Sequence, residues 1–259
     1  MMTTAADNPV TPAWYPTADY LQRSRLRKLM QQHQIDTVPA WRAWAAADIG
    51  RYWDTVVRDL DLTFAEPYTK AVDLSRGAPW PQWFVDGSFS YVSNAIDRHA
   101  RSNRANDPAV IWEGDAGDQR TVSFAELQSE TNRLANVLTG LGIGSGDVVG
   151  IFMPMLPETV AAVLACGKIG AIYTPLFSGF GAEAVATRLG DCNARVLLTV
   201  DGFFRRGKTV PIKDVADAAL ISVPSVETVI VLRRTGQTIN WVPGRDLDWT
   251  GRMQEAADT

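Results

Sequence analysis

The second half of the chain alternates short apolar runs with helix-like segments, and this pattern restricts the fold more than any other feature. Apolar runs that suit buried strands cover residues 147–153, 171–177, 195–200 and 226–232. Repeated strand–helix–strand units bring parallel strands together in one sheet. The sequence therefore predicts an α/β fold, with a mostly parallel sheet flanked by helices.

Local signals predict the elements around these strands. Residues 109–114 and 120–124 flank a glycine-containing turn and predict a hairpin. Ser123 and Glu126 have the spacing of a capping box, so a helix is expected to follow the hairpin and to run to about Thr139. The other expected helices begin at Pro157, cover 182–189 and cover 213–220. Glycines that suit helix ends are Gly140, Gly142 and Gly190.

The first part of the chain is richer in tryptophan and less regular. Helical stretches are expected at 20–32 and 40–60, and proline and glycine residues interrupt the sequence that follows. We interpret this part as an extended helical and loop segment that wraps around a larger body. The predicted division is a wrapping segment over residues 1–108 and an α/β subdomain over residues 109–259.

Composition excludes several classes of function. The net charge is −4, which does not favour a nucleic-acid partner, since such proteins usually carry a strong basic excess. No uninterrupted apolar run reaches the roughly 20 residues that a membrane span requires. The two cysteines, Cys166 and Cys192, fit a reducing compartment. The expected location is the cytoplasm.

One short motif permits more than one interpretation. Residues 202–209, with the sequence GFFRRGKT, fit the pattern of a nucleoside-triphosphate loop. However, bulky residues occupy the loop, and Pro211 follows where such a loop would continue into a helix. A triphosphate loop is therefore the least favoured of the alternatives for this segment.

The chemistry of the same residues favours an anionic ligand. Arg205, Arg206 and Lys208 place three cations on one short loop, and Gly207 permits close approach. The loop follows a predicted parallel strand, at the carboxyl end where open α/β sheets bind ligands. A solvated basic turn without a ligand is the equally weighted alternative.

The order of segments resembles that of the acetyl-CoA synthetases, which are AMP-forming acyl-CoA synthetases of the adenylate-forming ligase superfamily. The resemblance begins with WFVDGSFSYVSNAIDRHA at Trp83–Ala100 and continues through almost all of Gly146–Gly202. It extends through VPSVETVIVLRRTG at Val223–Gly236 and GRDLDW at Gly244–Trp249. Its length, rather than any single motif, makes it specific.

The resemblance implies an enzyme that joins a carboxylic acid to coenzyme A with ATP and Mg²⁺, and it favours a short-chain acid. It also implies that the loop formed by Arg205, Arg206, Gly207 and Lys208 contacts the 3′-phosphate and adenine end of coenzyme A. The turn that contains Gly179 lies beside that loop in the family. The family usually has arginine at the position of Lys208 and a small residue at the position of Arg206, so the charge is kept while the geometry differs.

The phosphate loop of the family, which ends in Pro-Lys-Gly, does not occur within these 259 residues. We therefore expect the chain alone to be an inactive N-terminal fragment without catalytic residues, metal ligands or a required cofactor. Self-association through uncovered apolar surface is also expected. The alternative function is a non-catalytic domain that binds coenzyme A or a partner protein.

Overall fold

The computed structural model describes residues 13–115 and 117–259. The chain divides between Phe89 and Ser90 into two compact units, which are described separately below. The helices described in these ranges are all too short or too polar to cross a bilayer.

The N-terminal unit contains two pairs of consecutive helices. Ser24 ends the first helix and caps the second, because its hydroxyl accepts the Arg27 amide. Asp48 acts in the same way between the third and fourth helices. Each predicted helical stretch is therefore confirmed, but a capping residue divides it in two. The helices are α1 (Ala18–Arg23), α2 (Arg25–Gln32), α3 (Val38–Ala47) and α4 (Ile49–Asp59).

Strands β1 (Lys70–Asp73) and β2 (Gln82–Val85) form an antiparallel pair in this unit. This region was expected to be loop, and that expectation was wrong. Each strand has only four residues, which is too short for a clear alternation of apolar and polar side chains. Aromatic rings contribute to the unit's packing: Trp41 is buried and stacks on Trp44 with 4.8 Å between ring centroids.

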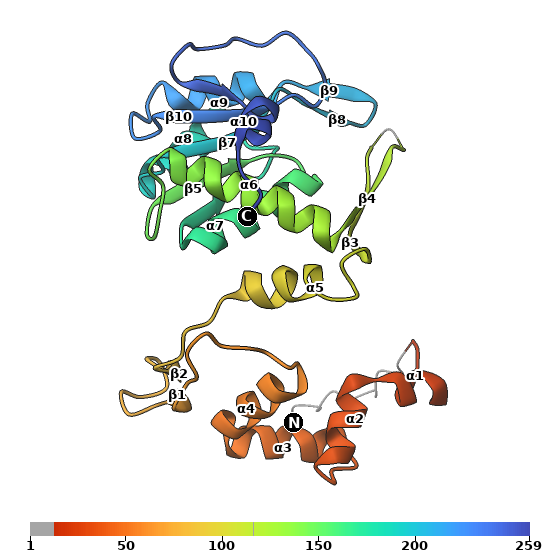
Figure 1. The fold of residues 1–259 in the computed structure, drawn as a ribbon. Coiled ribbons are helices and arrows are strands. Elements are labelled where there is room, and N and C mark those ends of the chain that lie inside the picture. Colours follow the sequence, from red (N-terminus) through yellow and green to blue (C-terminus); the bar gives the residue numbers. More distant parts are fainter. Residues whose placement is uncertain (1–12, 116) are drawn as a thin grey trace, which may run out of the picture. The chain divides into compact units, whose positions relative to one another are not determined.

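The C-terminal unit is built on a five-stranded parallel sheet with the order β11-β10-β7-β5-β6. Of these strands, Figure 1 labels β10, β7 and β5. The predicted α/β class and parallel sheet are confirmed. Short β11 was not predicted as a strand, although its sequence was part of the resemblance. The strands are β5 (Val148–Phe152), β6 (Ile172–Pro175), β7 (Val196–Val200), β10 (Thr228–Leu232) and β11 (Asp246–Asp248).

Helices connect and cover these strands. Connections between parallel strands of one sheet are almost always right-handed. Because the strand order reverses direction after β6, this rule assigns α7 to one face of the sheet and α8 and α9 to the other. Helix α6 packs against α7 and α10, while α8 packs against α9. The helices are α6 (Phe124–Gly140), α7 (Pro157–Ile169), α8 (Ala182–Asp191), α9 (Ile212–Leu220) and α10 (Trp249–Glu255), preceded by the π-helix η1 (Ser93–Asp97) and α5 (Arg98–Ala100).

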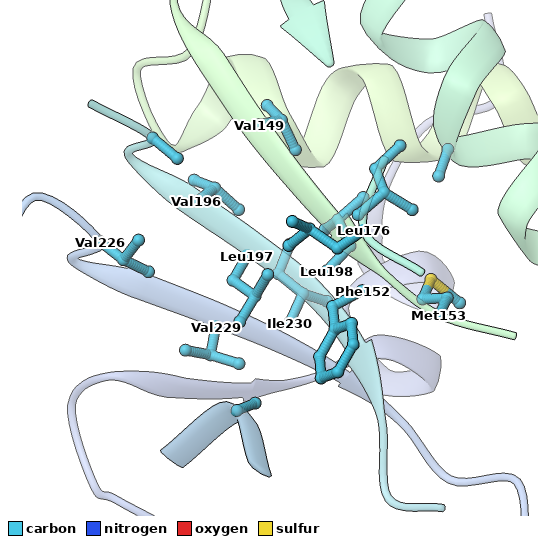
Figure 2. Packing of buried hydrophobic residues seen from close by; sticks show 14 of the residues in the cluster. Val149, Phe152, Met153, Leu176, Val196, Leu197, Leu198, Val226, Val229 and Ile230 are labelled. Carbon is cyan, nitrogen blue, oxygen red and sulfur yellow. The ribbon is translucent and has the colours of Figure 1, made fainter. Parts of the chain in front are cut away.

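The core of the unit lies along the central strands, as the close view in Figure 2 shows. Val149, Leu197 and Leu198 have no exposed surface, and Ile230 retains only 1%. All five residues of β7 are buried. Parallel strands covered on both faces are expected to be apolar throughout, which explains why continuous apolar runs predicted them.

The predicted helix boundaries are mostly confirmed. The Ser123–Glu126 capping box is present, and Gly142 takes a left-handed conformation (φ 75°) just beyond α6. The prediction that Gly190 stops α8 was wrong, because the helix runs through it to Asp191. The left-handed residue there is Asn193 (φ 52°), and the following amide returns to the Leu189 carbonyl. Asparagine tolerates this conformation better than most residues.

Two small hairpins complete the unit. The predicted hairpin at 109–124 is confirmed as β3 (Pro108–Glu113) paired with β4 (Gln119–Ser123). The second hairpin pairs β8 (Phe203–Arg205) with β9 (Lys208–Val210), in the segment that the sequence presented as a basic loop. The candidate site lies where these hairpins meet the sheet.

Candidate functional site

The sheet contains a topological switch point between β5 and β7. These strands are neighbours, but β5 leads to β6 on one side and β7 leads, through the β8–β9 hairpin and α9, to β10 on the other. Open α/β sheets bind ligands in the crevice at the carboxyl ends of strands that diverge in this way. The topology therefore marks the residues that follow β5 and β7 as the first place to look for a site.

A cavity of about 440 Å³ lies at this position. Residues that follow β5, β6, β7 and β10 contribute to its walls, together with the tip of the β3–β4 hairpin. The lining residues are Trp112, Glu113, Gly114, Asp115, Pro154, Met155, Leu156, Phe177, Ser178, Phe203, Phe204, Arg205 and Arg234. Its size is within the range of small-molecule sites.

The β8–β9 hairpin carries the predicted cationic residues. Arg205 pairs with Lys208 across a two-residue turn made by Arg206 and Gly207, which have φ angles of 51° and 70°. Two positive φ angles are characteristic of the type I′ turn, whose twist matches that of a hairpin. Gly207 suits the second position because it has no Cβ.

This geometry excludes the triphosphate-loop interpretation. Such a loop requires a helix to begin at its Gly-Lys-Thr sequence. Here Lys208 begins a strand, and α9 begins only at Ile212, after Pro211. That alternative was therefore wrong.

Arg205 lines the cavity, while Arg206, Gly207 and Lys208 form the exposed tip beside it. The Gly207 amide donates a hydrogen bond of 3.3 Å to the Asp115 carboxylate of the β3–β4 hairpin. Arg205 thus faces the cavity, and the exposed hairpin tip next to it carries two further cationic residues, Arg206 and Lys208. This arrangement suits an anionic group such as a phosphate.

Gly179 lies in the turn between β6 and α8, next to two residues that line the cavity, Phe177 and Ser178. A Cβ added to Gly179 would lie 2.6 Å from the Phe177 ring, so any larger residue would displace that ring. Phe177 makes an edge contact with Phe180, with 5.6 Å between ring centroids. Glycine thus permits the ring to pack closely against the turn at the cavity wall.

The β3–β4 hairpin supplies cavity residues that the sequence analysis did not identify. The indole N–H of Trp112 donates to the Met155 carbonyl at 2.7 Å, which fixes the hairpin against the loop after β5. The available signal was an aromatic residue in a predicted hairpin. It was insufficient because many hairpins carry aromatic residues for packing alone.

Arg234 is the second residue that the sequence analysis missed. It lies two residues beyond the end of β10 at the same edge of the sheet, and the carboxyl-end rule could have identified it. Its guanidinium donates to the Asp118 carboxylate at 2.6 Å. It also lies over the rings of Trp112 and Phe204, 5.2 and 5.5 Å from their centroids.

The backbone of Arg234 is held by Asp201, which follows β7 and has no exposed surface. The Asp201 carboxylate accepts the amides of Gly202, Arg234, Thr235 and Gly236 at 2.7 to 3.2 Å. Burial would raise the pKa of this carboxyl, but the hydrogen bonds from the backbone amides outweigh burial and lower it. Asp201 is therefore a buried anion that joins the carboxyl ends of β7 and β10.

The cavity thus combines two kinds of surface. Cationic side chains, Arg205 and Arg234, face it from two elements, and aromatic rings of Trp112, Phe177 and Phe204 contribute flat apolar walls. A ligand with a flat ring and a phosphate group matches both. Over residues 13–115 and 117–259, no group of three or more histidine, cysteine, aspartate or glutamate side chains is placed to hold a metal ion.

Comparisons with known proteins agree with this geometry. The solved structure of acetoacetyl-CoA synthetase from Streptomyces lividans superposes with a TM-score of 0.87 at 27% identity, over 95% of this chain and 38% of that protein. Acetyl-coenzyme A synthetase of Mycobacterium tuberculosis (strain CDC 1551 / Oshkosh) is 44% identical over 93% of this chain and 35% of its own length. The corresponding enzyme of Mycolicibacterium smegmatis is 36% identical over 98% of this chain and 26% of its own length.

The chain thus spans about a quarter to a third of the length of these two curated relatives. Residues 39–95 match the family described as the acetyl-coenzyme A synthetase N-terminus. Residues 96–257, more than half of the chain, match the family described as AMP-binding enzyme. The chain therefore belongs to the AMP-binding enzyme family, in the branch of AMP-forming acyl-CoA synthetases whose N-terminal region it shares.

Proposed function

We propose that this chain is the N-terminal part of an ATP-dependent acyl-CoA synthetase. In the complete reaction a carboxylate attacks the α-phosphate of ATP and releases pyrophosphate, and the thiolate of coenzyme A then attacks the acyl-adenylate and releases AMP. Family membership and the names of the relatives support this proposal. The same names favour a short acid, and the two free cysteines favour a cytoplasmic location.

The part of this reaction that the described residues fit best is recognition of the phosphorylated end of coenzyme A. We propose Arg205, Arg206, Gly207 and Lys208 as the residues that bind its 3′-phosphate, with Gly179 in the adjoining turn. The observation that carries this assignment is the cationic hairpin tip beside a cavity at the switch point of the sheet. Arginine and lysine side chains bind phosphate through charge-assisted hydrogen bonds.

Calorimetric titration tests this site. The purified chain is expected to bind coenzyme A more tightly than 3′-dephospho-coenzyme A, and Arg205→Ala is expected to abolish the preference. Loss of one charge-assisted contact should weaken coenzyme A binding about tenfold. Arg252→Ala is the matched control, because it removes an exposed arginine that pairs with Glu255 on α10, away from the residues that line the cavity. Equal affinity for the two ligands would refute the phosphate contact.

We propose further that the 259 residues alone do not catalyse the ligation, and that ATP and Mg²⁺ serve the complete enzyme. The sequence holds no Pro-Lys-Gly phosphate loop, and the described residues form no group suited to a metal ion. Exchange of labelled pyrophosphate into ATP, in the presence of acetate, measures the first half-reaction directly. Exchange above background by the purified chain would refute this part of the proposal.

The alternative is a non-catalytic domain that binds coenzyme A, and the same cavity supports it. This alternative would be favoured if the protein encoded by the complete native reading frame bound coenzyme A but did not exchange pyrophosphate into ATP. The division into a wrapping segment (1–108) and an α/β subdomain (109–259) remains a proposal, as does self-association. Analytical ultracentrifugation of the purified chain tests the latter.

A further inference from the structure

Arg234 contacts both hairpins that border the cavity. Its guanidinium donates to Asp118, which lies between β3 and β4, and it also lies over the ring of Trp112 on β3. On the other side it lies over the ring of Phe204 on β8. The Arg234 side chain thus links two hairpins. Figure 1 shows that these hairpins, β3–β4 and β8–β9, come from different parts of the sequence.

The backbone of Arg234 is independently fixed. Its amide donates to the buried Asp201 carboxylate at 2.8 Å, and the two amides that follow donate to the same group. A substitution of the Arg234 side chain leaves these backbone bonds in place. The turn after β10 therefore provides a rigid base from which the side chain reaches the hairpins.

A backbone amide also connects the two hairpins among the described residues. The Gly207 amide donates to the Asp115 carboxylate at 3.3 Å, just beyond the usual range of about 2.7–3.2 Å for such bonds. The β8–β9 hairpin has only three residues in each strand, and Phe203, which is 8% exposed, is the one buried residue in those strands. Short hairpins have little stability of their own, so contacts beyond the hairpin must hold the tip in place.

We propose that Arg234 is a positioning residue, which holds the β3–β4 and β8–β9 hairpins against each other and so aims Arg205 at the ligand phosphate. Its planar, always charged guanidinium can pair with a carboxylate and stack on aromatic rings at the same time. Lysine can supply the charge but not the planar stacking. The identity of the ligand rests on the proposed function, whereas the effect on the hairpins does not.

Hydrogen exchange of the purified 259-residue chain, read by mass spectrometry, tests the positioning role without any ligand. Arg234→Ala removes two cation–π contacts and an exposed ion pair, which together should speed exchange of peptides over 203–210 about tenfold. The exchange rate of the same peptides in Arg234→Lys should lie between the rates in the wild type and in Arg234→Ala. Peptides from β7 and β10 should not change, which also shows that the variants are folded.

The matched control is Arg233→Ala. Arg233 is the adjacent residue, and its guanidinium instead lies 5.4 Å from the ring centroid of Trp241 and donates to the Gln237 carbonyl. The Arg233→Ala variant removes the same charge from the same turn, but it should leave amide hydrogen exchange in both hairpins unchanged. Equal effects of Arg233→Ala and Arg234→Ala on the hairpins would overturn the proposal.

Asp118→Asn separates a positioning role from direct contact with the ligand. This change keeps the cation of Arg234 but removes its charged anchor. A positioning role predicts faster hairpin exchange and about threefold weaker binding of coenzyme A, the scale of one exposed ion pair. If Arg234 acted only as a cation for the ligand, the loss of a nearby negative charge would strengthen binding instead, and the proposal would be wrong.

The two proposals fail in different ways. If wild-type chain does not bind coenzyme A but Arg234→Ala loosens the hairpins, the proposed ligand is refuted and the positioning role stands. If coenzyme A binds and Arg234→Ala changes neither hairpin exchange nor affinity, the positioning role is refuted and the proposed ligand stands.

Discussion

Replacement of Asp201 by asparagine should destabilise the C-terminal unit more than a one-atom change suggests. The carboxylate is fully buried, and one oxygen accepts the Gly202 and Arg234 amides while the other accepts the Gly236 amide. In either orientation of the asparagine amide, its NH₂ group faces at least one backbone N–H. The variant therefore loses a charge-assisted hydrogen bond and leaves a buried donor without an acceptor.

The expected loss in free energy of unfolding is about 3 kcal/mol, because hydrogen bonds to charged groups contribute about 1.5–3 kcal/mol and an unpaired buried donor costs about 1–3 kcal/mol. The two effects overlap and are not simply added. Domains of this kind are stable by about 5–15 kcal/mol, so the variant should fold but unfold at clearly lower urea. Asp214→Asn, an exposed residue in the first turn of α9, should change stability by less than about 1 kcal/mol.

The difference between wild type and Asp201→Asn should also depend on pH. The folded-state pKa of Asp201 is lowered from the ordinary value of 3.8, so its contribution is present above that value and is lost as the pH falls below it. Urea unfolding at pH 7 and near pH 3 measures both differences. A loss below 1 kcal/mol at pH 7, or a difference that does not narrow in acid, would refute this description of Asp201.

Two further predictions concern the core. Gly150→Ala should lower the free energy of unfolding by about 1–3 kcal/mol, because its Cβ would lie 2.5 Å from a buried methyl of Leu189 and 3.0 Å from one of Leu197. An unchanged urea midpoint would contradict this prediction, since it would show that the core rearranges to accommodate the added methyl group. Cys166 has no exposed surface, and burial raises its pKa to about 12. Ellman's reagent at pH 8 should therefore leave Cys166 unmodified in the folded chain and label it only in denaturant, while the half-buried Cys192 reacts earlier; rapid labelling of both thiols in the native protein would contradict the packing.

The regular elements were predictable because their signals are local. The strand at Val196–Val200 is apolar at four of five positions, and the capping box at Ser123 needs only four residues to identify. The glycine at 190 misled because a glycine near a helix end often marks its stop, whereas here the left-handed conformation is adopted by Asn193. The sequence thus indicated correctly that the helix ends near this point, but the prediction assigned the helix stop to Gly190 instead of Asn193.

The candidate site was only partly predictable because contacts between distant segments create it. The cationic residues Arg205, Arg206 and Lys208 could be read from the sequence, as could their place after a parallel strand. Their arrangement on a two-residue hairpin turn could not, because each strand has only three residues. Trp112 and Arg234 join the site only when the β3–β4 hairpin and the end of β10 meet the same cavity.

The most direct test of the central claim is a ¹H–¹⁵N titration of the deuterated chain with coenzyme A and, separately, with 3′-dephospho-coenzyme A. The claim is that the β8–β9 hairpin tip binds the 3′-phosphate. It predicts that coenzyme A shifts the amide resonances of residues 204–208, with Gly207 among the largest, and that the dephospho form shifts them far less. Equal shifts from the two ligands, or shifts confined to residues away from the hairpin, would contradict it.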